Sequence, residues 1–456
     1  MGLLLLVIMA VLEIGLAILT FTKKKEKAAW MKNRLMIRAV EAGIVGIVMA
    51  LPMVYQKVRF WGTMILLLIM LTVAGIVYLT RRKKADGEKK KAGVVISVLF
   101  SIILIGLSLI PAFIISGYHG LPVTGEYEVA QTEVILLDSS RSDTFEEDGS
   151  YREVPAHFYY PDVTDTQVQD GFPLVLFSHG AFGYYQRNTS TYMELASHGY
   201  VVVALDHPHH AFFAKDTDGN AVIVDRNVLQ GAIDVTNGVI TGEEAYTMTH
   251  EWLQLRVEDE QYVLDTLEAA KEEKAFDDNW YLGETSKDEV LAILSMTDVE
   301  HIGRMGHSLG GATSVEVGRE REDIDAVVDI DGTMFGEELA YNDGDILYNE
   351  EPYPIPVLEF QNESAHNESI EMKNAGEAYE NDILMEHALD GRVVWIQGTE
   401  HMDYTDLPLI SPFLGSMLGS GSRSTEETMT ITNSLILQFF DFYLKGEGEA
   451  PESNGY

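Results

Sequence analysis

Four long apolar runs occupy the first quarter of the chain. They cover about residues 2–21, 36–55, 61–80 and 92–115, and each has about 20 residues or more, enough for a helix to cross about 30 Å of hydrocarbon. No basic residue precedes the first run and no small-residue cleavage site follows it, so we expect this run to be retained as a helix. The pattern predicts a membrane module over residues 1–118 with four transmembrane helices.

The pattern changes after residue 118. A segment rich in glycine, 116–125, reads as a linker, and short apolar runs that resemble buried strands follow it. These predicted strands are 133–137, 154–160, 173–178, 200–205, 301–305, 326–330, 356–360 and 393–397. Glu251–Lys274 has the apolar spacing of an amphipathic helix. Short strands that alternate with helical stretches predict an α/β domain over 119–456, with a mostly parallel sheet and helices on both faces.

Basic residues divide unevenly among the loops of the predicted membrane module. Six lie between runs one and two (Lys23, Lys24, Lys25, Lys27, Lys32 and Arg34). Seven lie between runs three and four (Arg81, Arg82, Lys83, Lys84, Lys89, Lys90 and Lys91), and the middle loop has only Lys57 and Arg59. Because positive loops stay in the cytoplasm, both chain ends and the α/β domain are expected outside, as part of a multi-pass protein of the cell membrane.

Two carboxylates, Glu13 and Glu41, fall inside the first and second runs. A carboxyl group in hydrocarbon is costly and raises the question of a role. The sequence shows no evident basic partner at matching depth, so we interpret both as protonated or helix-paired groups near the interface.

Composition narrows the function of the α/β domain. Residues 1–118 hold 16 Lys/Arg and 5 Asp/Glu, whereas residues 119–456 hold 16 Lys/Arg and 66 Asp/Glu. Such a domain repels polynucleotides, so no nucleic-acid partner is expected. The chain has no cysteine, which excludes disulfides, thiolate chemistry and cysteine metal sites. We expect no cofactor.

The clearest candidate chemistry is the segment GHSLGG at residues 306–311. It follows the predicted strand 301–305 and precedes a predicted helix, which is the strand–turn–helix setting of a G-x-S-x-G nucleophile. Glycines on both sides of Ser308 allow a sharp turn that exposes the serine hydroxyl. A serine hydroxyl needs a general base, and His401, just after the last predicted strand, is placed where this fold supplies it. His387, on a probable helix, is a poorer candidate.

The residue that orients the base is left open by the pattern. Asp331 ends the strand 326–330, and Glu363 follows the next strand, where many proteins of this fold place the acid. Asp329 would point to the same face as Asp331 but deeper in the sheet. The backbone N–H groups of Ala181 and Leu309 are the candidate oxyanion donors.

Two further segments could contribute to the predicted site or to the structure around it. The histidines of DHPHH (residues 206–210) could bind a metal, but no second cluster with ligand spacing exists, and we interpret them as lining the substrate pocket. The stretch 225–300 is longer than a strand connection requires, so we expect a helical cap insertion there.

Several motifs in order resemble the platelet-activating-factor acetylhydrolase-like family of α/β-hydrolases, over most of 126–445. They are FSHGAFG, LASHGYVVVALDH, LRVEDEQYVLDTLE, GRMGHSLGGAT, DIDGTMF and GTEHMDYTDLPLISP. The family's GHS-x-GG serine falls on Ser308, and its D-x-x-M-F acid falls on Asp331. Its H-x-x-(F/Y)-x-D motif falls on His401, Tyr404 and Asp406. The resemblance also places the oxyanion donors on Ala181 and Leu309, and favours Asp331 over Glu363.

The resemblance implies an ester hydrolase (a carboxylesterase or a lipase that deacylates phospholipids) acting through a Ser-His-Asp triad and an acyl-enzyme. Family members cleave short or oxidised acyl chains from phospholipids without calcium. The expected partner is therefore a small-molecule or lipid ester. The four-helix module departs from family members that are secreted or cytosolic. The alternative is a membrane-anchored sensor or binding protein with a non-catalytic hydrolase-like domain.

Overall fold

The computed structural model describes residues 1–22, 26–53, 55–85, 87–163, 171–342 and 344–456. Lys23, Lys24 and Lys25, counted above in the first loop, lie outside the described residues. The chain forms two compact units. Unit 1 contains residues 1–120 and 407–418, and unit 2 contains residues 121–406 and 419–456.

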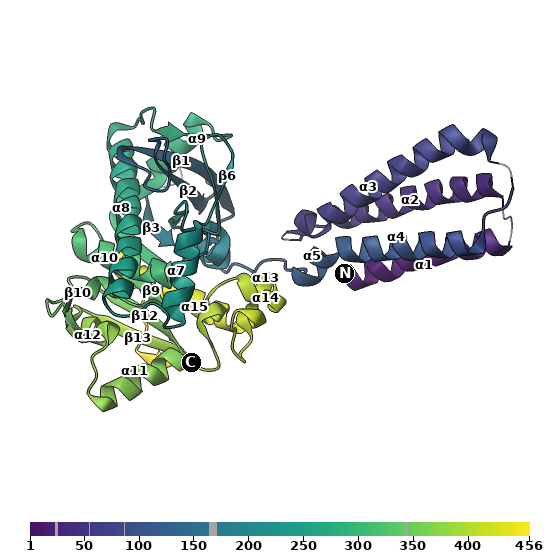
Figure 1. The fold of residues 1–456 in the computed structure, drawn as a ribbon. Helices are drawn as coiled ribbons and strands as arrows, with labels where there is room; N and C mark the ends of the chain where they lie inside the picture. The colour runs from purple at the N-terminus through teal and green to yellow at the C-terminus, as the bar shows by residue number, and fades with distance from the viewer. Residues whose placement is uncertain (23–25, 54, 86, 164–170, 343) are drawn as a thin grey trace. The chain divides into compact units, whose positions relative to one another are not determined.

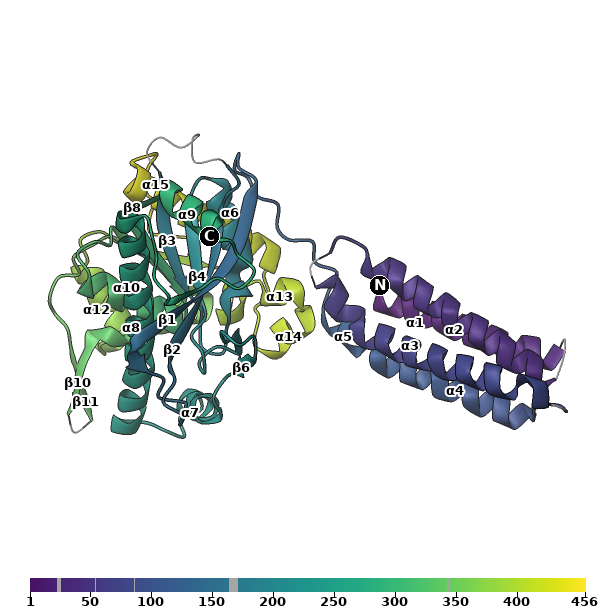
Figure 2. The same cartoon turned by 90° about the horizontal axis from the view of Figure 1, so that it is seen from above.

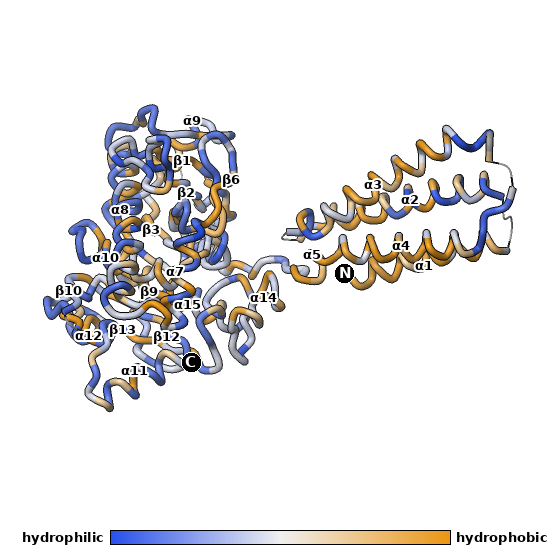
Figure 3. Tube along the Cα trace, viewed as in Figure 1, coloured by the Kyte–Doolittle hydropathy of each residue, from blue (hydrophilic) through white to orange (hydrophobic). Residues whose placement is uncertain are grey.

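Long helices that lie side by side form most of unit 1 (Figures 1 and 2). They are α1 (Gly2–Thr22), α2 (Lys27–Met49), α3 (Gln56–Arg81) and α4 (Lys91–Ser108), followed by the short α5 (Ile110–Ile114). Figure 3 shows apolar residues over most of α1, α3 and α4, more hydrophilic residues along α2, and hydrophilic residues where α3 ends and α4 begins. Many large apolar side chains point outward, as expected for helices that contact lipid.

Three of these helices, α1, α3 and α4, are long and apolar enough to cross a membrane. The second predicted run takes a different form. Its helix starts at Lys27, nine residues before the run, and ends at Met49. It therefore carries Lys27, Lys32, Arg34, Arg38 and Glu41, too many charges for a simple apolar span.

Arg38 lies at the centre of a buried charge cluster in unit 1. Its guanidinium contacts the carboxylates of Glu13 and Glu41 and donates a 2.7 Å hydrogen bond to Ser101 Oγ, and all four side chains are buried. Arg38 is thus the basic partner that was not evident in the sequence, and the interpretation of both carboxylates as paired groups is confirmed. Arg38 neutralises charge that would otherwise be costly between apolar helices.

Within the described residues of unit 2, ten strands form one sheet (Figure 1). From edge to edge the strands are β14 (Asn454–Gly455), β13 (Gly391–Ile396), β12 (Val357–Asn362), β9 (Ala326–Ile330), β8 (Thr297–His307), β3 (Phe172–Ser178), β4 (Val201–Leu205), β2 (Tyr151–Pro161), β1 (Val129–Ser142) and β7 (Trp280–Tyr281). Neighbours from β14 to β4 run parallel, and those from β4 to β7 run antiparallel.

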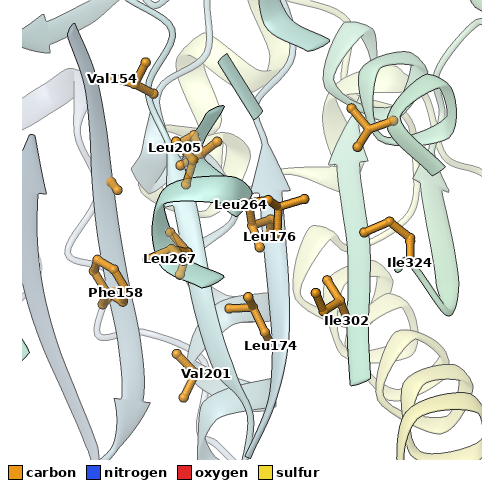
Figure 4. Packing of buried hydrophobic residues seen from close by; sticks show 14 of the residues in the cluster. Val154, Phe158, Leu174, Leu176, Val201, Leu205, Leu264, Leu267, Ile302 and Ile324 are labelled. Carbon is orange, nitrogen blue, oxygen red and sulfur yellow. The ribbon is translucent and has the colours of Figure 1, made fainter. Parts of the chain in front are cut away.

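Helices cover both faces of the sheet. One face packs against α6 (Thr189–Ser197) and α15 (Thr425–Lys445). The other face packs against α8 (Glu243–Glu273), α9 (Lys287–Met296), α10 (Leu309–Glu320) and α12 (Glu380–His387). Figure 4 shows this second core, where Leu264 and Leu267 of α8 meet Leu174, Leu176 and Val201 of the central strands. Such strands are apolar on both faces because both faces are buried.

Candidate active site

Ser308 lies in a tight turn between β8 and α10. Its backbone has φ 56° and ψ −127°, a strained conformation for any residue other than glycine. The flanking glycines allow the turn to be this close: a Cβ on Gly306 would lie 2.0 Å from Gly310 O, and one on Gly310 would lie 2.1 Å from Ser178 O. The turn places the serine at the carboxyl end of the central strand, where open α/β sheets bind ligands.

His401 and Asp331 meet at the same edge of the sheet. His401 follows β13 and begins a short 3₁₀ helix (His401–Tyr404), and Asp331 directly follows β9. His401 Nδ1 lies 2.6 Å from Asp331 Oδ2. A carboxylate accepts the proton of Nδ1, so this contact leaves Nε2 as the basic nitrogen of the neutral ring.

The surroundings of Asp331 keep it ionised. Burial by itself would raise the pKa of this carboxyl, but the hydrogen bond from His401 and those from Asn362 outweigh it and lower the pKa below its usual value. Asn362 donates from its backbone N–H at 2.7 Å and from Nδ2 at 2.8 Å. Asn362 was missed in the sequence, although its place at the end of a strand beside Asp331 was a usable signal.

The other candidate acids and bases have different surroundings. Glu363 is the first residue of a helix, and its carboxylate accepts a 3.0 Å hydrogen bond from the Gly398 N–H. Asp329 is fully buried and accepts the Gly332 N–H. His387 is the last residue of α12. None of these three is among the described residues that line the cavity around Ser308.

The candidate oxyanion donors both line that cavity. Leu309 starts α10, and Ala181 lies in the loop after β3. This loop approaches the Ser308 turn closely, since a Cβ on Gly180 would lie 2.8 Å from His307 Nδ1 and 3.1 Å from Ser308 Cβ. Phe182, the residue after Ala181, has a positive φ of 57°, as Ser308 does. The backbone of this loop can therefore come near a carbonyl bound at Ser308.

The histidines at 207 and 210 are buried and do not line the cavity, so that part of the sequence interpretation is wrong. The His207 ring lies 2.9 Å from Ser178 Oγ and 3.0 Å from Asp259 Oδ2. Arg256 of α8 donates to the carbonyl of His179 in the loop before Ala181. Burial lowers the pKa of His207 to about 4 despite the contact with Asp259, so the ring is neutral at pH 7. These buried contacts hold the loop that contains Ala181, the candidate oxyanion donor.

Among the described residues, no group of three or more His, Cys, Asp or Glu side chains is arranged to hold a metal ion. A second residue missed in the sequence, His307, lies beside the candidate base His401. Its ring centroid is 4.6 Å from that of His401, and its Nε2 is 3.1 Å from the His401 carbonyl. Burial, aided by the nearby His401, lowers the pKa of His307 well below its usual value, so this ring adds no charge.

Ser308, Asp331 and His401 line one cavity of about 650 Å³. The described contacts include no hydrogen bond between Ser308 Oγ and His401, and such bonds often tighten only when substrate is present. Aromatic and acidic side chains form much of the wall, and no lysine or arginine is among the described residues that line it.

Residues 225–300, the expected cap insertion, form only part of the cavity wall. Helix α7 (Arg226–Thr236) contributes Ala232, Val235 and Thr236, and the first turns of α8 add Thr249 and Trp252. The rest of α8 and α9 pack on the sheet. The remaining wall comes from segments after Asp331, including β11 (Asp345–Tyr348) and α11 (Glu363–Ala375).

The strand order, with the tight strand–turn–helix of Ser308 after a central parallel strand, defines an α/β-hydrolase fold and confirms the expected fold class. A solved structure of a ferulic acid esterase from Streptomyces cinnamoneus has this fold with a TM-score of 0.51, at 21% identity, over 72% of this chain and 93% of that chain. Residues 156–452 match the family described as platelet-activating factor acetylhydrolase, isoform II. The chain belongs to this family, as the motifs predicted.

Two curated relatives, from Bos taurus and Cavia porcellus, are both named platelet-activating factor acetylhydrolase. They are 23% identical to this chain over 282 and 309 residues, which is 60% and 64% of this chain. The matched parts are 57% and 61% of the relatives, so the chain spans less than two thirds of their length.

Proposed function

We propose that the chain is a serine hydrolase of carboxylic esters. Ser308 Oγ attacks the ester carbonyl while His401 Nε2 takes its proton, and the proton then passes to the departing alcohol. The acyl group stays on Ser308 until water, deprotonated by the same histidine, releases it as a carboxylic acid. Asp331 orients His401, and the N–H groups of Ala181 and Leu309 bind the oxyanion.

One observation carries the proposal: His401, oriented by Asp331 at 2.6 Å, shares a cavity with a serine on a strained strand–helix turn. If the Asp331–His401 pair were only structural, it would not require a serine on a strained turn beside it. If the Ser308 turn were only a glycine-rich connection, it would not require an oriented histidine in the same cavity. Membership of a family whose relatives are named acetylhydrolases supports the same reading.

The cavity suggests which esters fit. Its wall has acidic side chains at Glu338, Glu368 and Glu380 and, among the described residues, no lysine or arginine to balance them. Burial raises the pKa of Glu338 and Glu380 to about 7, so these two are partly ionised at neutral pH. An ester with an exposed anionic group would meet an unfavourable potential there. We therefore propose a neutral or cation-bearing ester with a short acyl chain, from a small molecule or a lipid.

We also propose that unit 1 anchors the enzyme in the cell membrane with the catalytic unit outside. The three apolar helices support membrane association, and the basic residues between the first and second and between the third and fourth apolar runs support this orientation.

The experiment uses the full-length chain in detergent, a fluorophosphonate probe and p-nitrophenyl acetate. Ser308→Ala should lose the probe adduct and at least about 10³-fold in turnover, because the covalent step disappears. Ser295→Ala, an exposed serine on α9, should keep both. A wild-type chain that neither reacts with the probe nor hydrolyses esters would instead favour a non-catalytic binding module.

A further inference from the structure

The cavity around Ser308 has an apolar part and an acidic part. The apolar part comes from α7 and from Trp252 of α8. The acidic part comes from segments that follow Asp331 in the chain, and it also contains aromatic side chains. It includes Glu338 (the first residue of β10, Glu338–Asn342), Tyr348 of β11, and Tyr379 and Glu380 where α12 begins. The two parts can hold chemically different ends of one substrate.

The carboxyl groups of Glu338 and Glu380 are buried without a partner from another residue. Only 9% and 8% of their surfaces are exposed. Among the described contacts, no other residue donates a hydrogen bond to either carboxyl and no cation pairs with it. The adjacent Glu337 shows the usual arrangement, because Arg319 donates to its carboxylate at 2.7 and 2.8 Å. A buried carboxyl that lacks such a partner and lines a cavity can take one from a ligand.

These two carboxyls lie within electrostatic reach of each other. Glu338 pairs with Tyr348 across the β10–β11 hairpin. Burial first, and then the nearby Glu338 and Asp382, raise the pKa of the Glu380 carboxyl to about 7. Burial raises the pKa of Glu338 to about 7 as well. Burial and both carboxyls also raise the pKa of Tyr348. A positive charge between the two carboxyls would relieve their repulsion.

An organic cation fits this part of the wall better than a metal ion. Among the described residues, no group of three or more His, Cys, Asp or Glu side chains is arranged to hold a metal. The rings of Tyr348 and Tyr379 line the cavity with the carboxyls, and aromatic rings attract ammonium groups. The described lining residues include no lysine or arginine, so a phosphate group would be unfavourable beside these carboxyls.

We propose that Glu338 and Glu380 bind a protonated amine on the alcohol part of the ester substrate. This inference rests on the proposed ester hydrolysis at Ser308. The apolar wall of α7 and Trp252 takes the acyl chain, which leaves the acidic part of the cavity to the alcohol. The substrate class is therefore a short-chain ester of an amino alcohol that carries no phosphate.

The test compares dimethylaminoalkyl acetates, with spacers from propyl to hexyl, with the neutral acetates in which CH replaces the protonated nitrogen. The full-length chain in detergent is assayed by release of acetic acid, and kcat/KM is determined for each pair. At pH 8 and the best spacer, the wild type should prefer the cationic ester about tenfold or more, since a hydrogen bond to a charged group contributes at least that much.

The preference should decrease from pH 8 to pH 6, because the two carboxyls become protonated while the amine stays charged. The ratio of the two esters cancels the titration of His401. Other titratable groups packed against the carboxyls are His250 and Tyr246 of α8, which contact the Glu338 carbonyl, together with Tyr348 and Asp382. A proton on His250 would oppose cation binding in the same direction, and a variant that keeps His250 but lacks both carboxyls separates the two effects.

Glu338→Gln/Glu380→Gln is that variant, and it removes both charges while keeping the shape of the side chains. Its preference for the cationic ester should fall to about twofold or less and should change little with pH. Glu371→Gln/Glu377→Gln is the matched control, because it removes the same charge from exposed residues that do not line the cavity. It should keep the preference of the wild type within about twofold. If the first double variant does not fold, Glu380→Gln alone should lower the preference about threefold or more.

Three outcomes would overturn this proposal and leave the ester hydrolase intact. They are hydrolysis of the neutral esters with no preference for the cationic ones, equal loss of preference in both double variants, and loss of preference in millimolar magnesium chloride at constant ionic strength. If the wild type hydrolyses none of the esters, the proposed function fails. Calorimetric binding of dimethylhexylamine then tests the site by itself: tighter binding to the wild type than to Glu338→Gln/Glu380→Gln supports it, and equal binding overturns it.

Discussion

Two of the three proposed catalytic residues have backbone angles that side-chain-bearing residues rarely adopt. Ser308 has φ 56° and Asp331 has φ 58°. Each directly follows a parallel strand and is tied to the next strand: Ser308 N donates to Ile330 O at 2.9 Å and Asp331 N donates to Phe360 O at 2.8 Å. The neighbouring strands therefore hold the strained turns in place, which fixes both side chains before substrate arrives.

Asp331→Asn tests the role of the acid. Asparagine keeps the shape but does not stabilise the imidazolium or favour the correct tautomer of His401. We expect ester turnover at neutral pH to fall about 10³- to 10⁴-fold with unchanged circular dichroism.

Glu363→Gln is the control for this substitution, because that carboxylate caps Gly398 at the next strand end. It should cost about tenfold or less. An inactive Glu363→Gln beside an active Asp331→Asn would transfer the role to Glu363.

Glu359, on β12 beside Asp331, gives a pH prediction. Burial raises its pKa to about 7, although hydrogen bonds from Asn381 at 2.8 Å and Gln361 at 3.0 Å oppose this. A carboxyl with a raised folded-state pKa stabilises the fold below its unfolded value of 4.5, and this stability is lost as pH rises through about 7.

Glu359→Gln keeps an acceptor oxygen and removes the titration. Its temperature of half-inactivation should match the wild type within about 1 °C at pH 5 and exceed it by about 5 °C at pH 8. Glu371→Gln, on an exposed face of α11, should show no such difference between the two pH values. A variant no more stable than the wild type at pH 8 would refute the assignment.

Among the helices, α7 bears most directly on substrate size. Ala232, Val235 and Thr236 face the cavity, whereas Ile233 is exposed. The helix packs closely on α8, because a Cβ on Gly231 would lie 2.7 Å from Met248 Sδ. Helix α7 therefore forms one side of the cavity wall.

Ala232→Phe should narrow the cavity. Hydrolysis of p-nitrophenyl hexanoate should then fall about tenfold more than hydrolysis of the acetate, by comparison of kcat/KM. Ile233→Phe places the same aromatic ring on the exposed side of the helix and should leave the ratio unchanged. Equal losses on both esters would show that Ala232 does not bound the acyl site.

The sequence predicted the central strands well because they are short, apolar and bounded by turns. The strand 326–330 matches β9 in full, and α8 starts at Glu243 rather than Glu251 because polar residues in its first two turns hide the pattern. Contacts between distant residues were harder to predict. Arg38 lies near the start of the apolar run 36–55. Only the packing of α1, α2 and α4 shows that it contacts Glu13, Glu41 and Ser101.

The same difference between local patterns and contacts of distant residues applies to the candidate site. The nucleophile turn and the histidine carry local motifs, so Ser308 and His401 could be named from spacing alone. The choice between Asp331 and Glu363 depends on which strand end faces His401, and periodicity holds no information about that. The buried histidines after β4 were misread because a strand-end loop can turn inward as well as toward the cavity, and the contact of His207 with Asp259 decides it.

For the whole molecule, charge distribution leads to a prediction of topology. Thirteen basic residues lie between the first and second or the third and fourth apolar runs of the sequence, and two lie between the second and third runs. Protease added to intact spheroplasts should therefore digest unit 2 while a cytoplasmic marker stays whole. Protection of unit 2 until the cells are lysed would reverse the assigned orientation.

Unit 1 is made from two separate stretches of chain, because residues 407–418 group with residues 1–120. Within it, Ser116 N donates a 2.6 Å hydrogen bond to Ile410 O, and Ser411 Oγ donates one of 2.7 Å to Ile114 O. During synthesis, the long helices leave the ribosome first, and about 290 further residues must be translated before their last partner appears. At roughly 5–20 residues per second, the membrane unit waits some 15–60 s for completion, and by then the segments of Ser308, Asp331 and His401 have all been made.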